Sequence, residues 1–273
     1  MTAVSPKIII FTDSRGRGLQ EFINNHPESG IYENIIRVLP GKDLIQISAS
    51  LKELINDLPI DKYHCVVFAG ICGLTERSNE DGISKISYPL SNRENKVHNV
   101  FATIQDLRQT FTNNITVCTI IPASLHKYFE RHNHNQSLPT ELEAEQNALL
   151  EDIETINAYI TQFNDTPNIN INLAKRFQRQ IKKKRQRTSS LSYRRISRFC
   201  DKDLPDGVHL SDNAKSTCFS LIYNSAIRNL KLQLTTTSAS EETSQTSSQE
   251  DSDTDWDFKR KRPTDNRTVT CIL

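Results

Sequence analysis

A serine, an aspartate and a histidine occupy positions in this chain from which they could together perform acyl transfer. Ser14 follows the apolar, β-branched run KIIIFTD and precedes a turn of glycines and arginines. A serine hydroxyl becomes a useful nucleophile only beside a general base, which a third group orients. Asp206 and His209, in the segment LPDGVHLSD, could supply the orienting carboxylate and the base. The alternative is that Ser14 and Asp206 are ordinary turn residues and that His209 only precedes a helix.

Predicted strands and helices alternate along the chain and must position these residues. Short runs of β-branched residues predict strands over 7–13, 34–41, 64–70, 114–123 and 168–173. Apolar residues at helical spacing predict helices over 18–26, 42–58, 97–111, 140–164 and 210–232. Two stretches without clear periodicity are predicted to be loops, namely 73–96 and 124–139. The alternation predicts a three-layer α/β/α sandwich around a mainly parallel, five-stranded sheet.

One edge of this predicted sheet is the natural place for a ligand. Open α/β sheets bind ligands outside the carboxyl ends of their strands. Ser14, Gly41 and Gly70 each follow or end a predicted strand, so three turns meet at that edge. The last predicted helix, with Ser211 or Asp212 as its cap, begins just after His209. We therefore expect the Ser14 turn and the loop that carries His209 to face one crevice.

The composition divides the chain near residue 234. Residues 1–233 form the predicted globular domain, with a basic insertion at about 175–203, and 234–273 form an acidic, Ser/Thr-rich tail. The tail contains too few apolar residues to offset the entropy of ordering, so we expect it to be disordered. The chain has two basic clusters: Lys182, Lys183, Lys184, Arg185 and Arg187 in the insertion, and Lys259, Arg260, Lys261 and Arg262 in the tail. They could bind nucleic acid or direct nuclear import, or they could simply be solvated.

Other features argue against several functional classes. The formal net charge of +1 implies no polyanionic partner for the chain as a whole. Six scattered cysteines without a CxxC pair predict neither a zinc site nor a disulfide framework, and they favour the cytoplasm or nucleus. His126, His132 and His134 are interpreted as part of a solvated loop rather than a metal site. No apolar run has the length of a membrane span, and we expect neither a metal nor another cofactor.

The order of these segments resembles that of the SGNH, or GDSL-like, hydrolases over roughly residues 7–232. FTDSRG resembles their first block, VLPGKDL their glycine block, AGICGLT their third block, and the D-x-x-H pair their last block. The resemblance implies that Ser14 is the nucleophile, His209 the base and Asp206 its partner. It also implies that Gly41 and the Gly70–Cys72 segment contribute to the oxyanion site, and that the substrate is a small ester or acyl compound. The basic segments also resemble, in composition, the SGNH-like domains of retroelement-encoded proteins.

Two positions depart from the family pattern. Thr12 replaces the glycine that precedes Asp13 in the family, and Cys72 replaces the asparagine that donates a hydrogen bond to the oxyanion. A thiol is a weak donor, and loss of one oxyanion donor in other enzymes costs about 10²–10³-fold in turnover. The chain is therefore a slow hydrolase, a hydrolase with a substitute donor such as Thr75 or Asn79, or an inactive module that binds nucleic acid or a protein partner through its basic insertion.

Overall fold

The computed structural model describes residues 5–56, 63–112, 114–134, 136–164, 171–173 and 202–244, together with two short strands at 178–180 and 197–199. Side chains of the last helix are described through Thr235. Met1–Leu234 form one compact unit and Thr235–Leu273 a second. The candidate site lies in the first unit.

A parallel sheet forms the centre of the first unit. Within the described residues it has four strands, in the order β2-β1-β3-β6. Their bounds are Lys7–Thr12 for β1, Glu33–Val38 for β2, Tyr63–Phe68 for β3 and Ile115–Val117 for β6. Strand β1 lies between β2 and β3 and pairs with both along its whole length. The turn that carries Ser14 therefore leaves the sheet from an interior strand.

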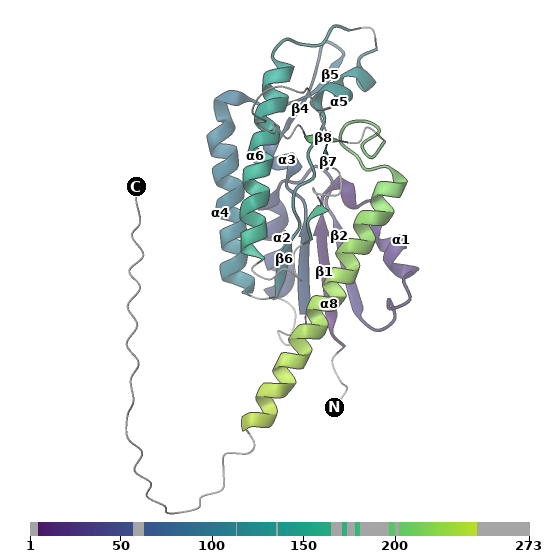
Figure 1. Cartoon of the computed structure of the whole chain (residues 1–273), viewed down its shortest axis with the longest axis vertical. Helices are drawn as coiled ribbons and strands as arrows, with labels where there is room; N and C mark the ends of the chain where they lie inside the picture. The colour runs from purple at the N-terminus through teal and green to yellow at the C-terminus, as the bar shows by residue number, and fades with distance from the viewer. Residues whose placement is uncertain are drawn as a thin grey trace, which may run out of the picture. The chain divides into compact units, whose positions relative to one another are not determined.

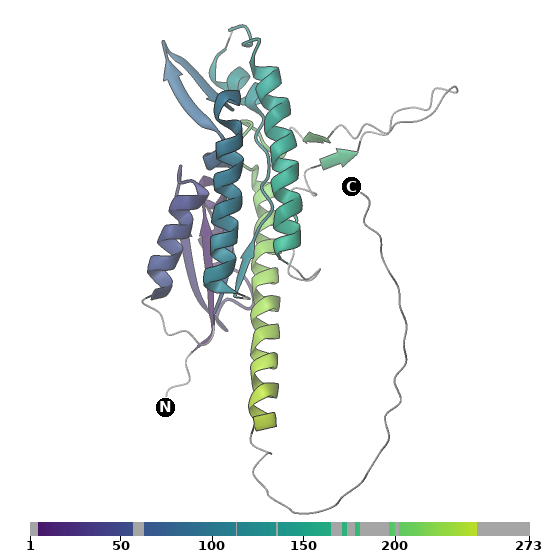
Figure 2. The same ribbon diagram turned by 90° about the vertical axis from the view of Figure 1, so that its left-hand side faces the viewer.

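Helices cover both faces of the sheet (Figures 1 and 2). One face packs against three helices: α2 (Leu44–Asn56), α4 (Arg93–Phe111) and α6 (Leu142–Phe163). The other face packs against α1 (Leu19–Asn24) and the part of α8 (Asp212–Ser244) that lies before Thr235. The predicted α/β/α sandwich is confirmed.

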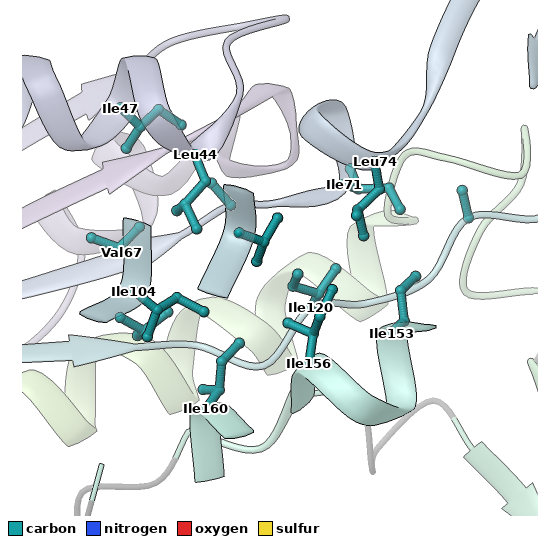
Figure 3. Packing of buried hydrophobic residues seen from close by; sticks show 14 of the residues in the cluster. Leu44, Ile47, Val67, Ile71, Leu74, Ile104, Ile120, Ile153, Ile156 and Ile160 are labelled. Atoms are coloured by element: carbon teal, nitrogen blue, oxygen red, sulfur yellow. The ribbon is translucent and has the colours of Figure 1, made fainter. Parts of the chain in front are cut away.

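Alternate residues of β1 enter two separate cores. Ile9 packs on the side of α2, α4 and α6, whereas Ile8 and Ile10 pack on the side of α1 and α8. All three side chains are fully buried, which explains why the strand has a continuous apolar sequence rather than an alternating one. Figure 3 shows part of the first core, to which Ile104 of α4 and Val67 of β3 both belong.

The stretch 73–96 contains regular structure, so the prediction of a loop was wrong. Its elements are α3 (Ile71–Leu74), β4 (Glu76–Glu80), β5 (Ile83–Ser87) and the 3-10 helix η2 (Leu90–Asn92). Strands β4 and β5 form an antiparallel hairpin. Asp81 and Gly82 have φ angles of +52° and +79° at its tip, as a two-residue type I′ turn requires. The Asp-Gly pair was the overlooked sequence signal.

The second predicted loop, 124–139, contains the helix α5 (Leu125–His132). Ser124 caps this helix, because its Oγ accepts a hydrogen bond from the N–H of Lys127 at 3.3 Å. The ring of His132 stacks on that of Tyr128, with centroids 4.0 Å apart. Across the described ranges, no cluster of His, Cys, Asp and Glu side chains is arranged to hold a metal ion.

Several predicted segments near the end of the chain are described only in part. The predicted fifth strand falls mostly outside the described residues, although the carbonyl of Ile171 accepts a hydrogen bond from the N–H of Thr119 at 3.2 Å. In the basic insertion, β7 (Gln178–Gln180) and β8 (Ser197–Phe199) form an antiparallel pair. The basic clusters at 182–187 and 259–262 lie outside the described residues.

The last helix differs from its prediction at one end. Ser211 is its cap, since Oγ accepts a hydrogen bond from the N–H of Ala214 at 3.3 Å. Helix α8 continues to Ser244, beyond residue 233, where the sequence predicts the tail to begin. Among the helices that the structure describes, none has the length and apolarity to cross a membrane.

Candidate active site

The turn after β1 holds Ser14 in a short 3-10 helix, η1 (Ser14–Gly16). Asp13 caps the turn, with its Oδ1 accepting a hydrogen bond from the N–H of Arg15 at 2.9 Å. A Cβ on Gly16 would lie 2.1 Å from Cγ2 of Thr12, so only glycine allows the chain to fold back this closely. The half-buried Ser14 is therefore held directly at the end of a central strand.

The loop before α8 joins Asp206 to His209. Asp206 Oδ2 lies 2.6 Å from Nδ1 of His209, and Oδ1 accepts the backbone N–H groups of Val208 and His209 at 2.9 and 2.7 Å. Burial opposes ionisation of Asp206, but the hydrogen bonds from the His209 ring and from these N–H groups hold its pKa well below the usual value. An ionised acceptor favours a proton on Nδ1 and leaves Nε2 free to accept one.

Gly207 gives this loop its shape. Its φ is +85°, and a Cβ there would lie 2.4 Å from the carbonyl oxygen of Ser124 and 2.7 Å from the backbone nitrogen of Tyr128. At this close approach, the N–H of Ser124 donates a hydrogen bond to the carbonyl of Gly207 at 2.7 Å. The close approach to α5 thus depends on the absence of a side chain between Asp206 and His209.

Gly207→Ala is expected to lower the free energy of unfolding by about 3 kcal/mol or more, because left-handed strain and a backbone clash add together. Urea unfolding of the purified variant measures this loss. Gly82→Ala is the matched control, since Gly82 has a similar φ of +79° but no atom within 4 Å of its Cβ position. That control should lose only about 1–2 kcal/mol. Equal losses of unfolding free energy in both variants would show that the close contact between Gly207 and α5 does not contribute to stability.

The side chain of Arg15 connects the Ser14 turn to the His209 loop. Its Nε donates to the carbonyl of Val208 at 3.0 Å, although the two residues are 193 positions apart. Asp13 also interacts electrostatically with His209. The Ser14 turn and the His209 loop are therefore adjacent at this bond. The Ser14 hydroxyl makes no hydrogen bond with the His209 ring in the described structure, and such distances are commonly longer before a substrate binds.

Two further loops reach the same edge. A Cβ on Gly73, in α3, would lie 3.3 Å from Cβ of Asp43, so the loop after β2 touches the turn after β3. Cys72 is half-buried and interacts electrostatically with Asp13, Arg15 and Asp43. Burial raises the pKa of the Cys72 thiol to about 11, with a further contribution from Asp13. The thiol is therefore neutral at ordinary pH and offers only its weak S–H donor.

The remaining predicted residues have more varied environments. Gly41 has a φ of +75° and open space around its Cβ position. Gly70 has a φ of +133°, and a Cβ there would lie 2.6 Å from Cδ1 of Ile120. Thr75, a candidate substitute donor, already donates its hydroxyl to the carbonyl of Ile71 at 3.0 Å. Asn79 lies in β4, opposite Ser84. The hydroxyl of Thr75, just after α3, is thus already engaged with the last turn of that helix.

Comparison with solved structures identifies the fold. A lipase/acylhydrolase from Enterococcus faecalis has a TM-score of 0.51 at 15% identity, with 80% of this chain and 93% of that chain covered. A putative acylhydrolase from Bacteroides fragilis NCTC 9343 has a TM-score of 0.50 at 15% identity, with coverage of 84% and 92%. A GDSL-like lipase from Bacteroides thetaiotaomicron VPI-5482 has a TM-score of 0.49 at 15% identity, with coverage of 82% and 89%. No family model and no curated protein matches the sequence. The chain therefore shares its fold with a solved lipase/acylhydrolase and a solved putative acylhydrolase.

Proposed function

We propose that this protein is an ester or acyl hydrolase of the SGNH type with Ser14 as its nucleophile. The observation that carries the proposal is the meeting of two distant loops at the carboxyl edge of the sheet. Arg15, next to Ser14, bonds to Val208, next to His209. His209 is in turn paired with Asp206 at 2.6 Å. A serine turn and an oriented histidine are the components that nucleophilic acyl transfer requires.

In the proposed reaction, Ser14 Oγ attacks the carbonyl carbon of the ester and His209 Nε2 takes the hydroxyl proton. The carbonyl electron pair moves onto oxygen, and the backbone N–H groups of Ser14 and Gly41 donate to that oxyanion. The tetrahedral intermediate collapses and releases the alcohol, which receives the proton from His209. A water molecule then attacks the acyl carbon and gives a proton to His209. The bond to Ser14 Oγ breaks, Ser14 takes that proton back, and the acid is released. The negative charge of Asp206 stabilises the imidazolium formed in each half of the reaction.

The oxyanion site is where this chain is expected to be weak. Cys72 offers a neutral thiol in place of a side-chain amide, and the hydroxyl of Thr75 is already engaged. Backbone donors alone provide less stabilisation of the developing charge than backbone donors together with an amide. We therefore propose a slow hydrolase in preference to one with a substitute donor.

Covalent labelling tests the proposal without knowledge of the substrate. A fluorophosphonate probe should phosphonylate Ser14 in the native protein, and mass analysis of the peptide that contains residue 14 should locate the adduct. Ser14→Ala should remain unlabelled, and heat-denatured wild-type protein should also fail to react. A chromogenic acetate ester then provides the turnover assay. Labelling of other serines but not of Ser14 would contradict the assignment.

The sequence also admits an inactive SGNH-fold module that binds nucleic acid or a protein partner. Its proposed contacts, the basic residues of the insertion, lie outside the described residues. The labelling experiment distinguishes the two functions, because an inactive module has no activated serine. An unlabelled, folded wild-type protein that loses nucleic-acid binding when Lys182, Lys183 and Lys184 are neutralised would favour the binding module.

A further inference from the structure

A buried guanidinium joins three segments of the chain at the candidate site. Arg15 is 3% exposed. Its Nε donates to the carbonyl of Val208 at 3.0 Å, its Nη2 to that of Pro122 at 3.2 Å, and its Nη1 to that of Ile121. All three acceptors are backbone carbonyls, two in the segment after β6 and one in the loop before α8. Charge-assisted hydrogen bonds of this kind are stronger than neutral ones, so Arg15 fixes both segments relative to the Ser14 turn.

The hydrogen bond from Arg15 to Val208 involves the peptide group that joins Val208 to His209. The carbonyl of this peptide group accepts from Arg15, and its N–H, which belongs to His209, donates to Asp206 Oδ1 at 2.7 Å. Hydrogen bonds on opposite sides of one peptide group strengthen each other. The same carboxylate also binds the His209 ring through Oδ2. The backbone and the ring of His209 are therefore both held relative to Arg15, which is covalently linked to Ser14.

A contribution to stability does not by itself explain why the charged Arg15 is buried beside the Ser14 turn. Burial lowers the pKa of Arg15, and the neighbouring Asp13 carboxylate opposes that shift. Burial likewise raises the pKa of Asp13, whose Oδ2 has no hydrogen-bond partner among the described residues. Buried charged groups can often be replaced by well-packed apolar residues without loss of stability. The arrangement is better explained by the geometry that the fixed fork of a guanidinium imposes.

We propose that Arg15 is a positioning residue, which sets the distance between the Ser14 hydroxyl and the His209 ring. This inference rests on the proposed hydrolase function and deepens it. Arg15 is buried and its guanidinium is occupied by three backbone carbonyls, so it is not expected to touch the substrate. Its loss should therefore lower kcat and leave KM nearly unchanged.

Arg15→Lys is the direct test, since lysine keeps the charge but cannot reach three carbonyls with a planar fork. A misplacement of about 1 Å at a reacting group can cost about 100-fold, so we expect kcat to fall by about 10–100-fold, with KM within about threefold. Asp13→Asn combined with Arg15→Met removes both buried ionisable groups together and provides a second variant. The double variant should show the same selective loss of kcat.

Arg93→Lys is the matched control. Arg93 uses the same fork between α4 and α6, where it donates to Asp152 at 2.7 Å and to Glu151 at 2.8 Å. It lies outside the proposed catalytic machinery, so Arg93→Lys should lose stability without losing kcat. A fall in kcat of equal size in the control would attribute the effect to general destabilisation and would overturn the inference.

A second readout does not require turnover. The proton shared by His209 Nδ1 and Asp206 should give a strongly deshielded NMR resonance, assigned by its loss in His209→Gln. Arg15→Lys should shift or broaden this resonance, whereas Arg93→Lys should not. A folded Arg15→Lys protein with unchanged kcat and unchanged resonance would overturn the positioning role. If wild-type protein hydrolyses no ester but the resonance still responds to Arg15→Lys, the proposed function fails while the positioning role stands.

Discussion

Asp206→Asn should lower kcat for ester hydrolysis by about 10⁴-fold, as an acid-to-amide exchange at this position of a triad does elsewhere. In the native loop, Oδ1 of Asp206 accepts two backbone N–H groups and Oδ2 binds the His209 ring. An asparagine can keep its oxygen on the two N–H groups, and its NH₂ then faces Nδ1. Because NH₂ donates rather than accepts, the ring proton moves to Nε2. The His209 ring can then no longer take the proton of Ser14.

The measurement compares kcat and kcat/KM of wild-type and Asp206→Asn proteins on a chromogenic acetate ester at pH 7–8. Both backbone hydrogen bonds can survive the exchange but lose their charged acceptor, so the thermal midpoint should fall while the protein remains folded. Asp212→Asn is the control, since Asp212 is a fully exposed carboxylate at the start of α8 that pairs only with Lys215 among the described ion pairs. If kcat is retained in Asp206→Asn, His209 does not depend on this carboxylate and the proposed triad is wrong.

The parallel sheet could be predicted from the sequence because its interior strands are buried on both faces. Ile8, Ile9 and Ile10 occur as one unbroken apolar run that polar turns bound on either side. The hairpin at 76–87 was missed for the opposite reason. Its first strand, ERSNE, has no apolar residue and is mostly exposed, so no alternation between a buried and a solvated face is visible. Only the Asp81-Gly82 turn marked it.

Helix α5 carried a signal that was overlooked. Leu125, Tyr128 and Phe129 are buried and lie at helical spacing directly after the Ser124 cap. The histidines and charged residues between them made the segment look like a solvated loop. A helix of this length presents only about two turns of pattern, too few for periodicity to separate it from chance.

The candidate site was predictable where its geometry is local. Asp206 and His209 are three residues apart, and a single turn brings them together whatever the rest of the fold does. Arg15 was not predictable in this way. An arginine in a turn usually faces solvent, and the burial of Arg15 depends on the packing of the segment after β6 and of the loop before α8. Contacts across 193 positions follow from topology rather than from local pattern.

Cys72→Asn is expected to raise kcat by about 10²–10³-fold, the reverse of the loss that follows removal of one oxyanion donor. Cys72 lies in the first turn of α3 and interacts electrostatically with Asp13, Arg15 and Asp43, which places it beside the Ser14 turn. Its thiol stays neutral, with a pKa raised by burial to about 11, and donates only weakly. An asparagine would place a strong N–H donor in the same region.

Cys72→Asn both removes the thiol and adds an amide donor, and Cys72→Ala measures the effect of removing the thiol alone. If the thiol contributes little, the alanine variant should keep kcat within about threefold of wild type, because a weak donor adds little to transition-state binding. The gain in Cys72→Asn should appear in kcat rather than KM, since the negative charge on the carbonyl oxygen develops only in the transition state. An asparagine variant no faster than the alanine variant would show that position 72 does not face the reacting carbonyl. Turnover in this chain would then depend on backbone donors alone, and the departure of Cys72 from the family pattern would have no catalytic consequence.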